Sequence, residues 1–364
     1  MKNPGIKILD RYIIRKFLGT YLFAIALIII IVVIFDYAEK VDDFISQKAP
    51  FRAIVFQYYL NFIPFFINQF SGLFTFIAVI FFTSKMAYQT EIIAILSSGV
   101  SFRRLMWPYF LSALAITLLS LVLSLWVIPA ANVRRVDFES HYIPRKMNMK
   151  YDQNIYRQIE PGTFAYIRNF SGDYNKASYM ALETYDGSSL VSVLEAANVT
   201  FNPETKRWTA PKYILRRFED EHEVFEQRMS LDTLINLNTD ELGHVGELVK
   251  TMDIATLNTF IRQQREKGSD MIAQFEVERQ SRYSYPISTF ILTLIGVSLS
   301  SRKVRGGTSL HIGIGIVLCF SYILFGRFAE EFAKGGVLPP ALSVWMPNVI
   351  FAVIAVYLYR KAPK

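Results

Sequence analysis

The sequence predicts an α-helical membrane protein with six transmembrane helices and an inserted all-β, jelly-roll-like domain. Hydrophobic residues make up 52% of the chain and charged residues only 19%, and the mean hydropathy is +0.26. A bilayer-spanning helix needs about 20 apolar residues. Six long stretches contain no Asp, Glu, Lys or Arg: residues 17–35, 53–83, 105–133, 283–301, 306–326 and 335–359. These observations exclude an ordinary soluble enzyme.

The six stretches form two groups of three. Residues 1–133 carry the first three predicted spans, and residues 283–364 carry the last three. The first stretch is too long for the core of a typical signal peptide, and no A-x-A-like cleavage site follows it. We therefore expect it to remain as a membrane span.

The inserted segment 134–282 holds most of the charged residues, and its first part, residues 134–252, is predicted to be the β domain. Runs rich in β-branched and aromatic residues alternate with turn signals, which is typical of short strands in a sandwich or jelly roll. The predicted strands are residues 163–170, 178–185, 190–199, 208–218 and 223–231. Several of them are apolar on both faces. Either a two-layer core with ordinary exposed apolar residues or a groove for an apolar ligand explains this pattern.

Residues 253–282 are predicted to be a helical connector. Ile254, Leu257 and Ile261 follow helical spacing, Asp253 is a suitable cap, and Gly268 ends this first helix. A second helix is expected from about Met271 into the fourth span, with Glu278 and Arg282 placed to form an i, i+4 pair.

The charges of the short loops predict the orientation. Six spans place both termini on one side, and Lys and Arg favour the cytoplasmic side. The termini, the loop 85–104 and the turn 302–305 together hold 14 basic and 2 acidic residues. The loops 36–52 and 327–334 hold 5 basic and 6 acidic residues. We therefore expect cytoplasmic termini and a β domain in the opposite compartment. The basic net charge follows from this topology and does not indicate nucleic-acid binding.

The loop between the second and third spans predicts a short amphipathic helix near residues 86–98. Its apolar side would carry Ala87, Ile92, Ile95 and Leu96, with Glu91 as the charged residue and Gly99 as its end. Such a helix can lie on the membrane surface with Glu91 solvated. It can also fit a groove on a cytoplasmic partner, with Glu91 as a charged anchor.

Cations at the outer ends of two spans also have two interpretations. Lys40 can hold an anionic headgroup as a point charge, or it can pair with Asp36 or Glu39. The same alternatives apply to Arg327, which precedes Glu330 and Glu331. His311 in the fifth span is better explained as a hydrogen-bonding residue between helices.

No catalytic or metal site is predicted. The chain lacks a G-x-x-x-x-G-K-[ST] loop, and residues 306–308 lack the strand that such a loop needs. The four histidines show no metal-ligand spacing, and Cys319 is the single cysteine. Any energy supply must therefore come from a partner or an ion gradient.

The chain resembles a known family, the LptF/LptG permeases of the lipopolysaccharide-export ABC transporter. Within this family it resembles LptG more than LptF. Three segments in the right order carry the resemblance, together with the arrangement of three spans, a β domain and three spans. They are Glu91, Gly99, Arg104 and Pro108 after the second span; Phe275, Glu278, Arg282, Pro286 and Gly296 at the fourth; and Gly336, Pro339, Pro340, Trp345, Pro347 and Asn348 before the sixth.

The resemblance implies a bacterial inner-membrane subunit with its β domain in the periplasm. It would pair with a second LptF/LptG-like subunit and bind an LptB-like ATPase dimer, which holds the ATP and magnesium; this chain itself would need no cofactor. Lipopolysaccharide would enter near spans 1 and 5 and pass through the β domain to LptC-like and LptA-like proteins.

The resemblance also assigns site residues. The segment that couples to the ATPase comprises Ala87, Glu91, Ile92, Ile95, Leu96, Gly99 and Arg104. The candidates for contact with lipid phosphates are Lys40, Lys48, Arg52 and Arg327.

One rival function class remains open, and a third option lacks support in the spans. A mechanotransmitting ABC subunit or membrane scaffold would use the same coupling loop without passing lipid through its spans. An ion-driven transporter would need carboxylates inside the membrane, which the spans lack.

Overall fold

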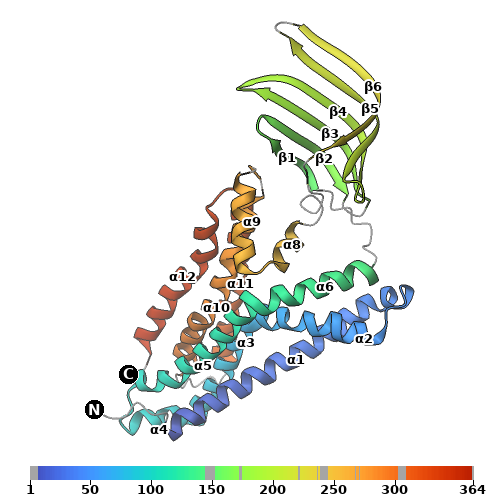
Figure 1. The fold of residues 1–364 in the computed structure, drawn as a ribbon. Coiled ribbons are helices and arrows are strands. Elements are labelled where there is room, and N and C mark those ends of the chain that lie inside the picture. Colours follow the sequence, from blue (N-terminus) through green and yellow to red (C-terminus); the bar gives the residue numbers. More distant parts are fainter. Residues whose placement is uncertain are drawn as a thin grey trace. The chain divides into compact units, whose positions relative to one another are not determined.

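The computed structural model describes residues 7–143, 152–171, 174–219, 222–235, 237, 245–266, 268–269, 271–301 and 309–362. Contacts divide the chain into two compact units. The helical unit comprises Met1–Pro144 and Glu276–Lys364, and the second unit comprises Arg145–Phe275 (Figure 1). Each unit is described by itself.

Six continuous helices within the described ranges are long and apolar enough to cross a membrane, which confirms the predicted spans. Two of them contain a π-helical segment, labelled η. In chain order the elements are α1 (Ile8–Ser46); α2 (Phe51–Ala53), η1 (Ile54–Tyr59) and α3 (Leu60–Tyr88); α5 (Phe102–Val122), η2 (Leu123–Val127) and α6 (Ile128–Tyr142); α10 (Ile272–Ser300); α11 (Ser309–Lys334); and α12 (Pro340–Lys361). A short helix, α4 (Glu91–Ser97), joins the second and third spans.

The third span continues beyond residue 133, where the β domain was expected to begin. Helix α6 ends only at Tyr142, and Arg135 and Glu139 form an i, i+4 ion pair at 3.5 Å within it. Arg and Glu are good helix formers, so a loss of hydropathy marks the end of the apolar stretch and leaves the helix intact.

Helices α1, α3 and α5 share one core. Ile13, Phe17, Tyr21 and Ile25 recur every four residues on α1 and are buried against residues of α3 and α5. The remaining faces of α1 are apolar and exposed, and α1 buries a smaller share of its apolar stretch than any other of the six described spans. Such exposed apolar surface fits contact with lipid or with a second subunit.

Helices α10 and α11 approach α3 through glycines. A Cβ atom added at Gly296 would lie 2.9 Å from Cγ1 of Val79, and one added at Gly315 would lie 2.1 Å from Cδ1 of Ile80. Small residues allow such close helix packing in membrane proteins.

The second unit contains one six-stranded antiparallel sheet in the order β1-β2-β3-β4-β5-β6. The strands are β1 (Asp152–Glu160), β2 (Thr163–Ser171), β3 (Lys176–Asp186), β4 (Ser189–Asn202), β5 (Arg207–Glu219) and β6 (His222–Leu234). The five predicted strands are confirmed. The sequence did not indicate β1, because the segment DQNIYRQIE is mostly polar and lacks a clear alternation.

The connectivity of the sheet is simpler than the two-sheet arrangement that the sequence suggested. Every described strand pairs with its neighbour in sequence, which makes a meander without Greek-key crossovers. One face of the sheet carries a buried apolar core with Ile167, Met180 and Ala196 on adjacent strands. The register places Phe164 and Tyr166 on the opposite face. The apolar residues on both faces are therefore a core and a row of packed aromatic rings.

Helices α8 (Val245–Thr251) and α9 (Ile254–Glu266) follow the sheet. Helix α8 lies in a segment that was assigned to the β domain. The predicted connector helix is confirmed, since the backbone N–H of Thr256 donates to Asp253 Oδ1 at 3.1 Å and Gly268 has φ +65°. The predicted Glu278–Arg282 pair is also present in α10, at 3.2 Å.

Candidate functional site

The loop between the second and third spans folds into a sharp corner and a helix shorter than expected. Residues 86–88 complete α3, and α4 begins at Glu91 after a turn at Gln89 and Thr90. Thr90 has φ +60°, a left-handed conformation that is strained for a β-branched residue. Gly99 has φ +86° and follows the end of α4, as predicted. A residue with a left-handed backbone conformation thus lies at each end of α4.

Both carboxylate oxygens of Glu91 contact helix α1. The hydroxyl of Tyr12 donates to Glu91 Oε2 at 2.9 Å, and Lys16 Nζ lies 3.6 Å from Glu91 Oε1. The Lys16 ammonium also lies 4.4 Å from the centre of the Tyr12 ring. Glu91 therefore links α4 to α1 within this chain.

A second polar link joins α1 to the start of α5. Arg104 donates two parallel hydrogen bonds to Asp10, at 2.7 and 2.6 Å, although 94 residues separate them. Asp10 is only 2% exposed, and it also accepts the backbone N–H of Lys7 at 2.8 Å. Two-point bonds between guanidinium and carboxylate are strong and directional.

The remaining predicted coupling residues differ in how far the rest of the protein covers them. Ala87 and Ile92 are buried in the core of the helical unit, and Ile95 and Leu96 pack against that core. The exposed side of α4 carries Ile93, Ala94 and Ser97 instead, and Ile93 is 45% exposed. Helical spacing separates the two faces. The sequence alone did not reveal which apolar face the rest of the protein covers.

Lys40, near the C-terminal end of α1, is engaged within the chain. Its ammonium lies 2.7 Å from Asp36 Oδ1 and also donates to the hydroxyl of Tyr58. Tyr58 and Tyr59 donate to the same carboxylate group at 3.1 and 3.2 Å. Of the two interpretations of Lys40, the structure shows the pairing with Asp36.

Two further lipid candidates occupy the segment after α1. Lys48 lies in the loop with φ +53°, and Arg52 lies in α2. Both side chains are exposed and make no hydrogen bond or ion pair with the described part of the chain. They are therefore available to an anionic ligand.

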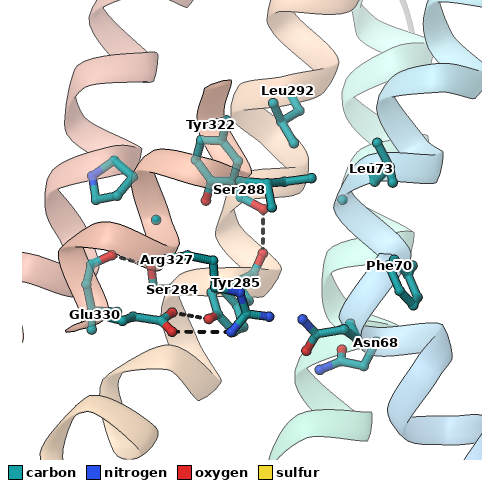
Figure 2. Close-up of a pocket in the computed structure, with 16 residues that line it drawn as sticks. Asn68, Phe70, Leu73, Ser284, Tyr285, Ser288, Leu292, Tyr322, Arg327 and Glu330 are labelled. Atoms are coloured by element: carbon teal, nitrogen blue, oxygen red, sulfur yellow. Dashed lines mark hydrogen bonds and ion pairs between the residues drawn. The ribbon is translucent and has the colours of Figure 1, made fainter. Parts of the chain in front are cut away.

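Arg327 lines a cavity of about 230 Å³ between α3, α10, α11 and α12. Figure 2 shows Arg327 and Tyr285 converging on Glu330, with Asn68 and Phe70 of α3 across the cavity. Glu330 is 5% exposed; it accepts a hydrogen bond from the Tyr285 hydroxyl and lies 3.4 Å from Arg327 Nη1. The Arg327 side chain is 56% exposed, so most of its guanidinium is accessible.

Sequence reasoning identified Arg327 but missed the cavity. The signal was present in the polar residues Asn68 and Gln69, which interrupt the second apolar stretch, because polar residues inside a span mark functional surfaces. The walls also contain apolar Phe70, Leu73 and Leu292. The cavity is therefore suited to an amphipathic molecule.

Metal ligation finds no support in the described ranges, where no three His, Cys, Asp or Glu side chains cluster. Cys319 is buried. The basic turn 302–305, residues 306–308 and the side chain of His311 lie outside what the structure describes.

Comparison with known proteins identifies one family. The family described as lipopolysaccharide export system permease LptF/LptG matches residues 11–361. The chain is also similar to the lipopolysaccharide export system permease protein LptG of Haemophilus influenzae. The two are 20% identical over 363 residues, which cover 98% of this chain and 99% of that protein.

Proposed function

The chain belongs to the LptF/LptG family of lipopolysaccharide export permeases, and we propose that it is a transmembrane subunit of an ATP-driven transporter. In this proposal it extracts lipopolysaccharide from the outer leaflet of the inner membrane and passes it to a periplasmic bridge. The chain performs no catalysis itself, because a separate LptB-like ATPase dimer binds ATP and magnesium. A second LptF/LptG-like subunit completes the membrane part.

The exposed side of α4 is the observation that carries this proposal. A short helix with exposed Ile93 and Ala94 on one side and a firmly packed opposite side can insert into a groove of a partner. Glu91, at the first turn of this helix, is 30% exposed by its side chain and can accept a further donor from that partner. These residues, rather than the buried Ala87 and Ile92, form the proposed ATPase-docking face.

The proposed orientation follows from the positions of the helix ends. The start of α1, helix α4 and the end of α12 lie at the same end of the helical unit (Figure 1), and the rings of Phe102 and Tyr359 are 5.8 Å apart. With the basic loop charges, this supports cytoplasmic termini and a periplasmic β domain. LptC-like and LptA-like proteins would then receive the lipid from that domain.

The cavity at Arg327 supports passage of lipid over a purely mechanical role. Its exposed guanidinium can bind a lipid phosphate while the apolar walls contact acyl chains. Lys48 and Arg52 are the further proposed phosphate contacts, and Lys40 would add the ammonium donor that does not bond Asp36 or Tyr58. A subunit that only transmits motion to its outer domain needs no such amphipathic cavity between its spans.

The test is purification of the tagged chain in mild detergent, followed by mass spectrometry of the proteins and lipids that accompany it. We expect an LptB-like ATPase, a second six-span subunit and a glycolipid that contains lipid A. An ATPase without glycolipid would favour the mechanotransmitting alternative. Absence of both would contradict the proposed function.

A further inference from the structure

Helix α1 is tied to the proposed coupling segment at two points. Glu91 at the start of α4 is held by Tyr12 and Lys16 of α1, and Arg104 near the start of α5 is held by Asp10 of α1. Glu91 precedes the proposed docking face in the sequence, and Arg104 follows it. A displacement of α4 therefore acts on α1 through a contact on each side of α4 in the sequence.

The two contacts differ in strength. The Asp10–Arg104 pair is bidentate, and its carboxylate is only 2% exposed although the Arg104 side chain is 35% exposed. Its two parallel bonds resist both stretching and rotation. The contact of Glu91 with Tyr12 and Lys16 is partly open to solvent, with the Lys16 side chain 35% exposed. The second contact is therefore the one that mutation can remove without leaving a buried charge unpaired.

The rest of α1 is built to transmit such a displacement. It is one helix from Ile8 to Ser46 with no proline inside, and a helix of that length acts as a stiff rod. It is held on its buried side by a single stripe of residues, whereas its other faces are exposed. Movement at its first turns therefore changes the surface that α1 presents along the membrane.

We propose that Tyr12 and Lys16, supported by the Asp10–Arg104 pair, are positioning residues that make α1 follow the movement of α4 during the ATPase cycle. This inference rests on the proposed function. It gives Glu91 two separable tasks, since one part of its surface faces the partner while its contact with Tyr12 and Lys16 faces α1. Tyr12 and Lys16 do not contribute to ATPase docking in this account.

The experiment uses the complete complex with the double variant Tyr12→Phe/Lys16→Gln. We expect the ATPase to remain bound and to hydrolyse ATP, whereas ATP-dependent release of lipopolysaccharide from proteoliposomes falls about tenfold, within the range of coupling between sites. Arg15→Gln is the matched control, because Arg15 is an exposed cation on α1 with no hydrogen bond or ion pair to the described residues. It should transport at the rate of the unmodified chain.

A second measurement follows the contact between α1 and α4 directly. Spin labels at Ile8→Cys and Ser98→Cys, both exposed positions, report the distance between the start of α1 and the end of α4. We expect one narrow distance, unchanged between the nucleotide-free and vanadate-trapped states, in the unmodified chain and in Arg15→Gln. In the double variant the distance should broaden and change on trapping.

Native transport together with a single unchanged distance in the double variant would overturn the inference. Loss of the ATPase in the double variant would also overturn it, because Tyr12 and Lys16 would then serve docking. Failure of the unmodified chain to retain any ATPase would instead contradict the proposed function, which separates the two failures.

Discussion

Glu91 and Thr90 show how two adjacent residues set the geometry of the proposed coupling segment. Thr90 turns the chain by taking a left-handed conformation, and Glu91 then starts α4 with its carboxylate directed at α1. Strained backbone of this kind persists where the surrounding structure holds it, and it is common at functional sites. The corner is therefore fixed by packing of α3 and α4 and not by the preference of threonine.

The substitution Glu91→Arg should uncouple the ATPase from lipid export. It places a cation on the side of Glu91 that faces the ATPase in the proposed complex, and this disturbs the ATPase directly. It also removes the acceptor for Tyr12 and puts a second cation beside Lys16, so α4 loses its link to α1 as well. We expect lipid-stimulated ATP hydrolysis to fall by at least about tenfold, while the thermal unfolding midpoint stays close to that of the unmodified protein. Normal lipid export in this variant would remove Glu91 from the coupling role.

The substitution Thr90→Gly should stabilise the protein. Glycine adopts a positive φ without steric strain, so the free energy of unfolding should rise by about 1 kcal/mol. Ser98→Gly is the control, since Ser98 has φ −75° and no strain to release. Thermal unfolding in detergent measures both, and a lower midpoint for Thr90→Gly than for Ser98→Gly would refute this explanation of the corner.

At the scale of elements, packing decides which faces are available. Helix α4 buries Ile92 and presents Ile93, and helices α10 and α11 meet α3 where glycine removes the side chain. Hydropathy does not decide between Ile92 and Ile93, which are the same residue type, and it does not indicate where the glycines of α10 and α11 meet α3. The docking face and the helix contacts thus follow from which surfaces the helical unit covers.

The glycine contact predicts the effect of one added methyl group. Gly296→Ala brings Cβ within 2.9 Å of Val79 Cγ1, and the stiff valine cannot move aside without shifting α3 or α10. We expect a loss of about 1–3 kcal/mol. Gly313→Ala is the control, since a Cβ there meets no atom within 4 Å. Equal thermal midpoints for the two variants would contradict this packing.

The exposed side of α4 predicts a docking defect in Ile93→Asp. A carboxylate at this position faces the proposed apolar groove, so the amount of ATPase that copurifies should fall by about tenfold or more. Leu234→Asp is the matched control, because Leu234 is an exposed apolar residue of the β domain. If both variants retain the ATPase equally, the docking face lies elsewhere.

At the scale of the whole molecule, the sequence predicted the order of spans and strands but not the cavity beside Arg327 or the exposed face of α4. Six charge-free stretches and alternating turn signals predicted the spans and five of the six described strands, because hydropathy and turn chemistry are local properties. Strand β1 was not predicted because its sequence is mostly polar, and it forms a strand by pairing with β2. The polar residues Asn68 and Gln69 mark one wall of the cavity in the sequence, but the cavity itself and the exposed face of α4 depend on residues brought together from distant segments.

Lipopolysaccharide is proposed to pass between the spans of this subunit, and site-specific photo-crosslinking at Phe70 is the direct test of this passage. Phe70 lines the cavity opposite Arg327 (Figure 2), whereas Leu342 on α12 is exposed and serves as the control position. We expect crosslinks to lipopolysaccharide at Phe70 that decrease when ATP is added, and a weaker, ATP-independent signal at Leu342. An active complex with no crosslink to lipopolysaccharide at Phe70 would contradict passage through this cavity.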